Sequence, residues 1–257
     1  MRLVSIASGS SGNCIYVGND NTHLLVDVGI SAKRIEAGLK EIDLCGKDLD
    51  GILITHEHSD HIQGIGVMAR KYGIPIYATR GTIQEILQKK TLGDIDVSLF
   101  ESIQADSPFM IKDMEINSMR ISHDARDPVA YRFRSGEKCA AIATDMGTYD
   151  DYTVDCLKGL DVLLLEANHD INMLQVGPYP YPLKQRILGT HGHLSNEAGG
   201  RLLSKVLHDD MKAIVLGHLS KENNLPELAY ETVRIELQAA ATKKGLPMPD
   251  LFVAERD

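Results

Sequence analysis

One seven-residue stretch constrains this chain more than any other: residues 55–61, Thr-His-Glu-His-Ser-Asp-His. The apolar residues 51–54 before it are typical of a buried strand, and residues 62–72 after it have the spacing of a helix. Three histidines and one aspartate are therefore expected on a single strand-to-helix turn. In an extended backbone, side chains two positions apart point the same way, so His56 and His58 should face one point.

The clustered side chains predict a metal centre, because imidazole nitrogens and carboxylate oxygens bind zinc, manganese and iron. Four such ligands within six residues are too many for one tetrahedral ion that must also hold water, so we expect two ions. His56 and His58 should bind the first ion. Asp60, continuing the same face, and His61, at the start of the helix, should bind the second. The alternative is a solvated loop that happens to be rich in histidine.

The rest of the chain has the pattern of a mixed α and β protein. Its 257 residues are 43% hydrophobic, which is enough to bury a large core. Short strand-like runs fill the first 30 residues and again residues 95–145, including residues 96–100, whereas residues 169–190 are less regular and rich in proline and tyrosine. Because we find no linker, low-complexity segment or charge run, we expect a single domain over residues 1–257.

Charge and cysteine content limit which partners and which cellular compartment we expect for the protein. The net charge of -9 argues mildly against broad nucleic-acid binding, although it allows a local basic groove. The four cysteines form no Cys-x-x-Cys pair, and no apolar run approaches the ~20 residues that span a bilayer. The apolar part of the N-terminus is too short for a signal peptide, so we expect a cytoplasmic protein without a membrane partner.

Further candidate ligands follow other predicted strands, where the scaffold is rigid. The strand predicted for residues 23–26 ends at Asp27, and the strand predicted for residues 114–121 is followed by His123. Each of these matches is weak when it is taken alone, because an aspartate after a strand is also a common turn residue. Two more predicted strands end in the same way, residues 139–144 at Asp145 and residues 213–216 at His218.

Together with the His-x-His-x-Asp-His pattern of residues 56–61, these strand ends resemble the five motifs of the metallo-β-lactamase superfamily. The resemblance implies an α+β fold, a four-layer αββα sandwich, with two divalent ions such as zinc or manganese, and iron or nickel as alternatives in a purified sample. It implies Asp145 as a bridge between the ions and Asp27 as the residue that orients the ligand loop. The implied ligands are His56, His58 and His123 for the first ion, and Asp60, His61 and His218 for the second.

Gly-His-Leu-Ser occurs twice, at residues 192–195 and 217–220, and only one of the two histidines can be the expected ligand. His218 follows a clean apolar strand, so we assign His218 to the metal and His193 to substrate binding or proton transfer. This arrangement resembles ribonuclease Z and its relatives, which implies that Glu166 orients His193 and that Asp60, His193 and Glu166 are the catalytic residues. The alternative is that His193 only packs near a helix N-terminus.

Three features favour a phosphodiester substrate, and each has a structural alternative. The turn at residues 8–13 can cradle a phosphate, or it is a flexible Gly/Ser turn. Residues 195–196 begin a predicted helix, where an anion binds well, or they form a simple cap. Residues 179–186 interleave aromatic and basic side chains that suit bases and phosphates, or they form an ordered surface loop. The candidate substrate contacts are Ser10, Ser11, Asn13, Ser195, Asn196, Tyr181, Lys184 and Arg186.

Motifs along nearly the whole chain resemble the YycJ/WalJ group of this superfamily, notably Ser-Gly-Ser-Ser-Gly-Asn at residues 8–13 and Glu-Ala-Asn-His-Asp at residues 166–170. The resemblance implies a metal-dependent 5′→3′ exonuclease that acts on DNA in repair, with a metal-bridging hydroxide as the nucleophile. DNA with a 5′ end is then the expected partner. Two alternatives remain: a small-molecule hydrolase, such as a lactonase or a glyoxalase II-like thioesterase, and a non-catalytic metal-bound module that binds DNA or protein.

Overall fold

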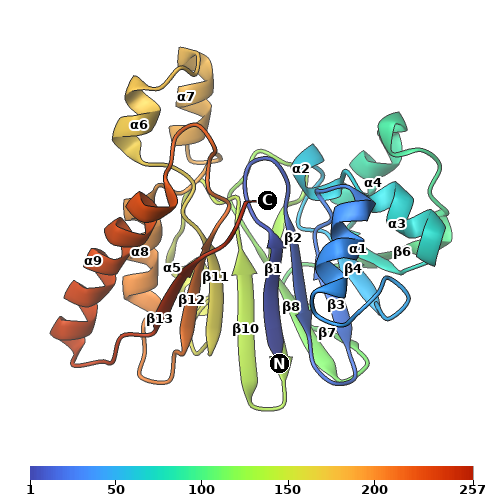
Figure 1. Cartoon of the computed structure of the whole chain (residues 1–257), viewed down its shortest axis with the longest axis horizontal. Helices are drawn as coiled ribbons and strands as arrows, with labels where there is room; N and C mark the ends of the chain where they lie inside the picture. Colours follow the sequence, from blue (N-terminus) through green and yellow to red (C-terminus); the bar gives the residue numbers. More distant parts are fainter. Residues whose placement is uncertain (257) are drawn as a thin grey trace.

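Two β-sheets face each other in the computed structural model, which describes residues 1–256, and helices cover their outer faces (Figure 1). The first sheet has six strands in the order β1-β2-β3-β4-β5-β6. Its strands are β1 (Arg2–Ala7), β2 (Cys14–Gly18), β3 (His23–Val26), β4 (Gly51–Leu53), β5 (Ile76–Thr79) and β6 (Phe100–Ile103).

The second sheet has seven strands in the order β13-β12-β11-β10-β9-β8-β7. Its strands are β7 (Phe109–Ile111), β8 (Met114–Arg120), β9 (Val129–Ser135), β10 (Lys138–Ala143), β11 (Val162–Glu166), β12 (Ala213–Gly217) and β13 (Asp250–Val253). Strands β3 to β6 run parallel in the first sheet, and strands β10 to β13 run parallel in the second. Since parallel strands end at the same edge, each sheet presents a row of carboxyl ends where a site can form.

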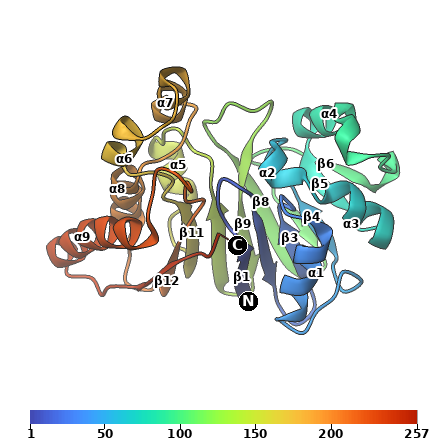
Figure 2. The same cartoon turned by 45° about the horizontal axis from the view of Figure 1, so that its top comes forward.

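The helices divide between the two sheets according to their order in the chain (Figure 2). The first sheet carries α1 (Ala32–Lys40), α2 (Ser59–Ile62), α3 (Ile65–Tyr72), α4 (Arg80–Gln88) and the 3-10 turns η1 (Lys90–Leu92) and η2 (Val97–Leu99). The second half of the chain supplies α5 (Asp151–Cys156), α6 (Ile171–Val176), α7 (Tyr181–Leu188), α8 (Asn196–Val206) and α9 (Pro226–Lys244). No helix among the described residues is long and apolar enough to cross a bilayer.

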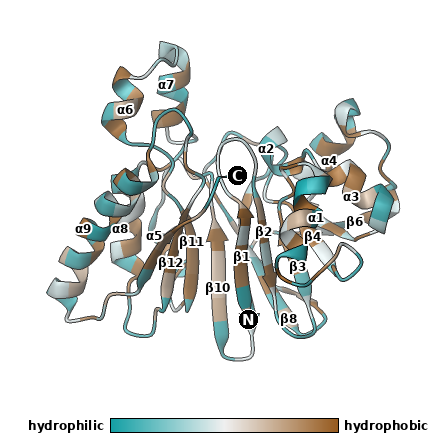
Figure 3. Cartoon of the chain, in the orientation of Figure 1, coloured by the Kyte–Doolittle hydropathy of each residue, from teal (hydrophilic) through white to brown (hydrophobic). Residues whose placement is uncertain are grey.

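Three apolar clusters hold the layers together. One lies between the sheets and joins residues such as Val26 and Leu53 to Tyr131 and Phe133 of the other sheet. The other two clusters lie between each sheet and its own helices. The outer helices carry both hydrophilic and hydrophobic segments, as helices with one buried face do (Figure 3). This arrangement confirms the expected α+β sandwich of two sheets with helices outside.

The structure differs from the sequence prediction in two short segments. Residues 169–190, predicted to be irregular, contain α6 and α7, which project beyond the carboxyl edge of the second sheet (Figure 1). These helices have only six and eight residues, too few to show a clear periodicity, and Asp170 starts α6 by accepting a hydrogen bond from Met173 N. Residues 97–99 form a 3-10 turn rather than a strand, because the Asp96 side chain caps it.

Candidate metal centre

The candidate ligands gather at the carboxyl edge, where loops after strands of both sheets meet. His56 and His58 lie in the loop after β4, and His58 is the N-cap of α2. Asp60 and His61 lie inside α2. The prediction that Asp60 continues the extended face of His56 and His58 is therefore wrong, because the chain is already helical at Asp60. The helical turn therefore separates the two pairs of side chains. The remaining candidate ligands follow β8, β10 and β12: His123, Asp145 and His218.

The backbone is left-handed at three of the strand ends that carry site residues. Asp27, Asp145 and His218 have φ angles of 60°, 61° and 55°. Non-glycine residues rarely adopt this conformation, and it costs on the order of 1–3 kcal/mol where the surrounding structure imposes it. The three residues follow β3, β10 and β12 by one or two positions, so the chain turns sharply at each strand end and directs the side chain toward the centre.

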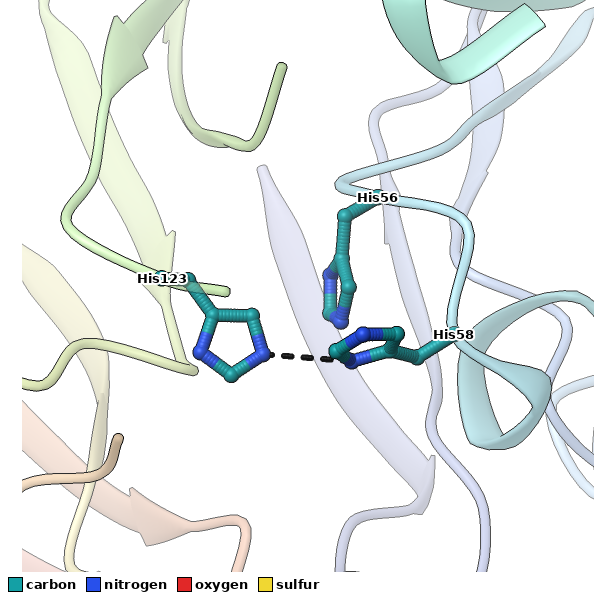
Figure 4. Close-up of side chains that lie close together, drawn as sticks. All are labelled: His56, His58 and His123. Atoms are coloured by element: carbon teal, nitrogen blue, oxygen red, sulfur yellow. Dashed lines mark hydrogen bonds between the residues drawn. The ribbon is translucent and has the colours of Figure 1, made fainter. Parts of the chain in front are cut away.

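His56, His58 and His123 converge on one point, although they come from different sheets (Figure 4). His123 Nε2 lies 3.2 Å from His58 Nδ1, and the His56 ring centroid lies 4.6 Å from that of His58 and 4.8 Å from that of His123. One ligand atom from each residue lies within 4.8 Å of the others, so the three histidines can share an ion. This trio is the set assigned to the first ion from the sequence.

A second group can also share an ion, because one ligand atom from each member lies within 4.8 Å of the others: Asp60, His61 and His218. Asp60 Oδ2 lies 3.4 Å from His61 Nε2 and 3.5 Å from His218 Nε2. Asp145 lies between the two groups: its Oδ1 is 3.8 Å from His123 Nε2, and its Oδ2 is 3.4 Å from His61 Nε2. A carboxylate in this position can contact an ion in each group and offset the repulsion between two dications.

Unpaired buried atoms test whether these residues suit a metal. His56 Nε2, Asp145 Oδ2 and His218 Nε2 are buried, and none has a hydrogen-bond partner among the described residues. Leaving a buried polar atom unpaired costs about 1–3 kcal/mol, so three at one point indicate a missing partner. Nitrogen and oxygen ligands in this number suit zinc or manganese. The donor set therefore fits two divalent ions.

Asp27 and Thr55 hold the candidate ligand His61 in place. Asp27 Oδ2 accepts hydrogen bonds from His61 Nδ1 at 2.8 Å and from Thr55 Oγ1 at 2.9 Å, while its Oδ1 accepts one from Thr55 N. Burial raises the pKa of Asp27, and the neighbouring His61 and Thr55 oppose that shift. Because the carboxylate fixes the proton on His61 Nδ1, the Nε2 lone pair is directed toward the centre.

Glu166, the last residue of β11, connects several parts of the site. Its Oε1 accepts hydrogen bonds from His193 Nδ1 at 2.8 Å and from His218 Nδ1 at 2.9 Å. Its Oε2 accepts from the backbone N–H groups of Met146 and Leu194, at 3.0 Å each. Burial raises the pKa of Glu166, but the two histidines outweigh burial and hold the pKa below its usual range. One carboxylate thus orients a candidate ligand and the candidate proton donor.

The candidate substrate contacts from the N-terminal turn separate into exposed and buried residues. Ser10 and Ser11 are exposed. Asn13 is fully buried, accepts a hydrogen bond from Gly9 N at 3.1 Å, and lies 3.2 Å from His61 Nε2. Its position therefore links the turn to the candidate metal ligands, while the two serines remain open to solvent.

The candidate contacts of the second half are mostly engaged within the protein. Ser195 caps α8 by accepting a hydrogen bond from Ala198 N, and Asn196 is fully buried and bonded to Asn224. Lys184 Nζ donates to the carbonyl oxygens of Gln175 and Gly177 at 2.7 Å each, which ties α7 to α6. Of the last two candidate contacts, one is paired and the other is largely exposed. Arg186 Nε donates to Asp124 Oδ2 at 2.5 Å, whereas Tyr181 is 73% exposed.

Sequence reasoning missed two residues that support the site. Glu57, inside the histidine-rich stretch, accepts a hydrogen bond from Arg126 N at 2.7 Å and so ties that stretch to the β8–β9 loop. Asn168 donates to His218 O at 2.9 Å and holds the turn after β12. Glu57 lies between two ligands and Asn168 lies in the motif of residues 166–170, so position in a motif was the available signal.

Comparison with known proteins places the chain among metal-dependent hydrolases of one family. A family model described as a beta-lactamase superfamily domain matches residues 23–218. Exodeoxyribonuclease WalJ of Streptococcus pneumoniae strain D39 is 46% identical over 241 residues, which are 94% of this chain and 90% of the relative. Exodeoxyribonuclease YycJ of Bacillus anthracis is 39% identical over 247 residues, 96% of this chain and 91% of the relative.

Solved structures agree on the fold at much lower identity. Zn(2+)-bound PqqB from Methylobacterium extorquens has a TM-score of 0.72 at 15% identity, covering 99% of this chain and 98% of that one. The metallo-beta-lactamase fold protein YhfI from Bacillus subtilis has a TM-score of 0.70 at 18% identity, covering 99% and 96%. The sandwich of this chain is therefore a metallo-β-lactamase fold, as the sequence predicted.

Proposed function

The chain belongs to the metallo-β-lactamase superfamily of metal-dependent hydrolases, and we propose that it is a 5′→3′ exonuclease that digests DNA with two metal ions. The observation that carries the proposal is the position of Asp145 between two groups of ligands. The relatives named exodeoxyribonucleases, which match almost the full chain, support DNA as the substrate. The direction of digestion and the role in DNA repair rest on the motif resemblance.

Each ligand group has a role in this proposal. His56, His58 and His123 would hold one ion, and a second group, Asp60, His61 and His218, would hold the other. Asp145 would contact both ions. Two bound divalent ions supply an activated water and offset the charge of the phosphate. The protein contributes rigid placement, because Asp27 and Glu166 fix the imidazoles of His61 and His218 through Nδ1.

His193 is the group proposed to protonate the leaving oxygen. Glu166 accepts a hydrogen bond from His193 Nδ1, which leaves Nε2 as the free ring nitrogen. The His193 ring centroid lies 5.2 Å from those of His123 and His218, so the ring borders both ligand groups. Its side chain is 19% exposed, which allows exchange of a proton with solvent after each turnover.

The decisive assay compares several substrate classes in one experiment. The full-length protein with Mn²⁺ is given 5′-labelled duplex and single-stranded DNA, beside a panel of lactones and thioesters. We expect release of mononucleotides from DNA and loss of turnover in His58→Ala and Asp145→Ala. His208→Gln, which changes a histidine outside the two ligand groups, is the matched control. Turnover of a lactone or thioester alone, or DNA binding without turnover, would contradict the proposal.

A further inference from the structure

A cleft of about 520 Å³ lies beside the metal centre and shares His123 with it. This volume falls within the range of sites that hold small organic ligands. The lining includes Arg120, Ser122, Tyr149, Tyr152 and His191. None of these residues is a candidate metal ligand, and the mechanism above uses none of them.

The walls of the cleft are direct continuations of the segments that carry the metal centre. Ser122 precedes His123, and Tyr149 follows Asp145 by four residues. His191 precedes His193 by two residues. A group bound in the cleft would therefore lie next to a phosphate held at the centre.

Hydrogen bonds join the three segments into one rigid wall. Gly147 N donates to Ser122 O at 2.8 Å, and Ser122 Oγ donates to Thr190 O at 2.8 Å. Gly147 packs so closely that a Cβ there would lie 2.4 Å from Gly192 N, so only glycine fits. The cleft is thus built before any ligand arrives, and a preformed site loses little entropy on binding.

The chemistry of the lining suits a nucleoside. Tyr149 is half-buried and lines the cleft. Lys205 Nζ covers one face of its ring at 5.0 Å from the centroid, so a base would stack on the opposite face. The carboxylate of Asp106 near the wall is already paired, because it accepts a hydrogen bond from Tyr152 and forms an ion pair with Arg120 at 2.8 Å. Aromatic faces bind every base, whereas polar side chains meet the sugar.

We propose that this cleft binds the nucleoside adjoining the scissile phosphate, with Tyr149 as the surface on which its base stacks. This inference rests on the proposed nuclease function and assigns the cleft as the place where part of the DNA substrate binds. Because stacking does not depend on the identity of the base, the cleft suits digestion without strong sequence preference. Tyr149 is then a substrate-binding residue and takes no part in the chemical step.

Two substrates test this in the wild-type protein, so the test does not depend on a variant that folds. The terminal nucleotide of a 5′-phosphorylated oligonucleotide, or its neighbour, is replaced by an abasic analogue. Stacking of a base on an aromatic side chain corresponds to a roughly 5- to 150-fold change in affinity, so KM should rise about 10-fold for one of the two replacements while kcat is unchanged. Equal KM values for all three oligonucleotides would overturn the proposal.

Variants then assign the effect to the ring. Tyr149→Leu keeps an apolar side chain but removes the aromatic face, and Tyr149→Phe is the control that keeps it. We expect Tyr149→Leu to raise KM for normal DNA about 10-fold and to respond no further to the abasic replacement, whereas Tyr149→Phe should behave as the wild type. An abasic penalty that persists in Tyr149→Leu would place the base elsewhere.

A binding measurement separates failure of this inference from failure of the nuclease proposal. Calorimetry compares a deoxynucleoside monophosphate with deoxyribose 5-phosphate on wild type and Tyr149→Leu, and it needs no turnover. We expect the nucleotide to bind wild type about 10-fold more tightly than the sugar phosphate, and Tyr149→Leu to bind both equally. If the protein does not digest DNA, this difference still tests the cleft. Equal binding of both ligands to wild type would overturn the inference even in an active nuclease.

Discussion

Replacing Glu166 with glutamine changes one atom at the most connected carboxylate of the site. The carboxylate accepts four hydrogen bonds: two from histidine Nδ1 atoms at 2.8 and 2.9 Å, and two from backbone N–H groups at 3.0 Å. Glutamine has one accepting oxygen and one donating amide nitrogen. Whichever way the amide is turned, it therefore places a donor against two other donors.

The magnitude follows from the two hydrogen bonds that cannot form. An unpaired buried donor costs about 1–3 kcal/mol, so two such donors lower the free energy of unfolding by about 2–6 kcal/mol. If the amide nitrogen instead faces His193 and His218, both imidazoles must move their proton to Nε2. His218 would then lose the lone pair that a metal needs. Losing such a supporting hydrogen bond typically lowers metal affinity about 10- to 100-fold.

Two measurements check the prediction for Glu166→Gln. Urea unfolding of the metal-free protein gives the free energy of unfolding, and competition with a chelator gives the affinity for Zn²⁺. The control is Glu231→Gln, which removes an exposed pair with Arg234 and should cost less than about 1 kcal/mol. If Glu166→Gln unfolds at the same urea concentration as the control and binds Zn²⁺ equally well, Glu166 does not act as the hydrogen bonds indicate.

Three further predictions concern other parts of the site. Asp27→Asn should lower Zn²⁺ affinity about 10- to 100-fold, because His61 loses the carboxylate that orients it; unchanged affinity in chelator competition would contradict this. Gly29→Ala should cost about 3 kcal/mol or more in urea unfolding, since its Cβ would lie 1.6 Å from Asp60 O; a stable variant would show that the turn can move. Burial lowers the pKa of His169 from its ordinary 6.5 to about 4. As the pH falls through that window, the unfolded chain binds a proton at His169 before the folded chain does, so about 3 kcal/mol of stability is lost. In metal-free protein His169→Gln should remove that part of the pH dependence, whereas the exposed control His191→Gln should retain it.

The sequence predicted those parts of the candidate site whose geometry is set by neighbouring residues in the chain. His56, His58, Asp60 and His61 lie within six residues after a buried strand, so residue type and spacing indicated a metal centre with two ligand pairs. The sandwich of two sheets also followed from the order of apolar runs together with the family resemblance. The short helices α6 and α7 escaped detection because a helix of six or eight residues shows too little periodicity.

The roles of the basic side chains in α7 depend on tertiary contacts. Lys184 and Arg186 have the composition of a phosphate-binding segment, yet the folded chain gives Lys184 two carbonyl partners and pairs Arg186 with Asp124. The sequence gives the charges that a segment carries but not the partners to which those groups bond. Tyr181, at the start of α7, remains largely exposed.

By itself the sequence indicated the turn of candidate ligands at residues 55–61 and the family to which the chain belongs. Only the tertiary structure decided how the centre closes. His123, Asp145 and His218 are far apart in the chain, and they meet because both sheets present the carboxyl ends of strands at one edge. The left-handed backbone at Asp27, Asp145 and His218, and the sharing of Glu166 between two histidines, arise from contacts across that edge. Such contacts have no signature in residue spacing, because they depend on how separate strands are stacked.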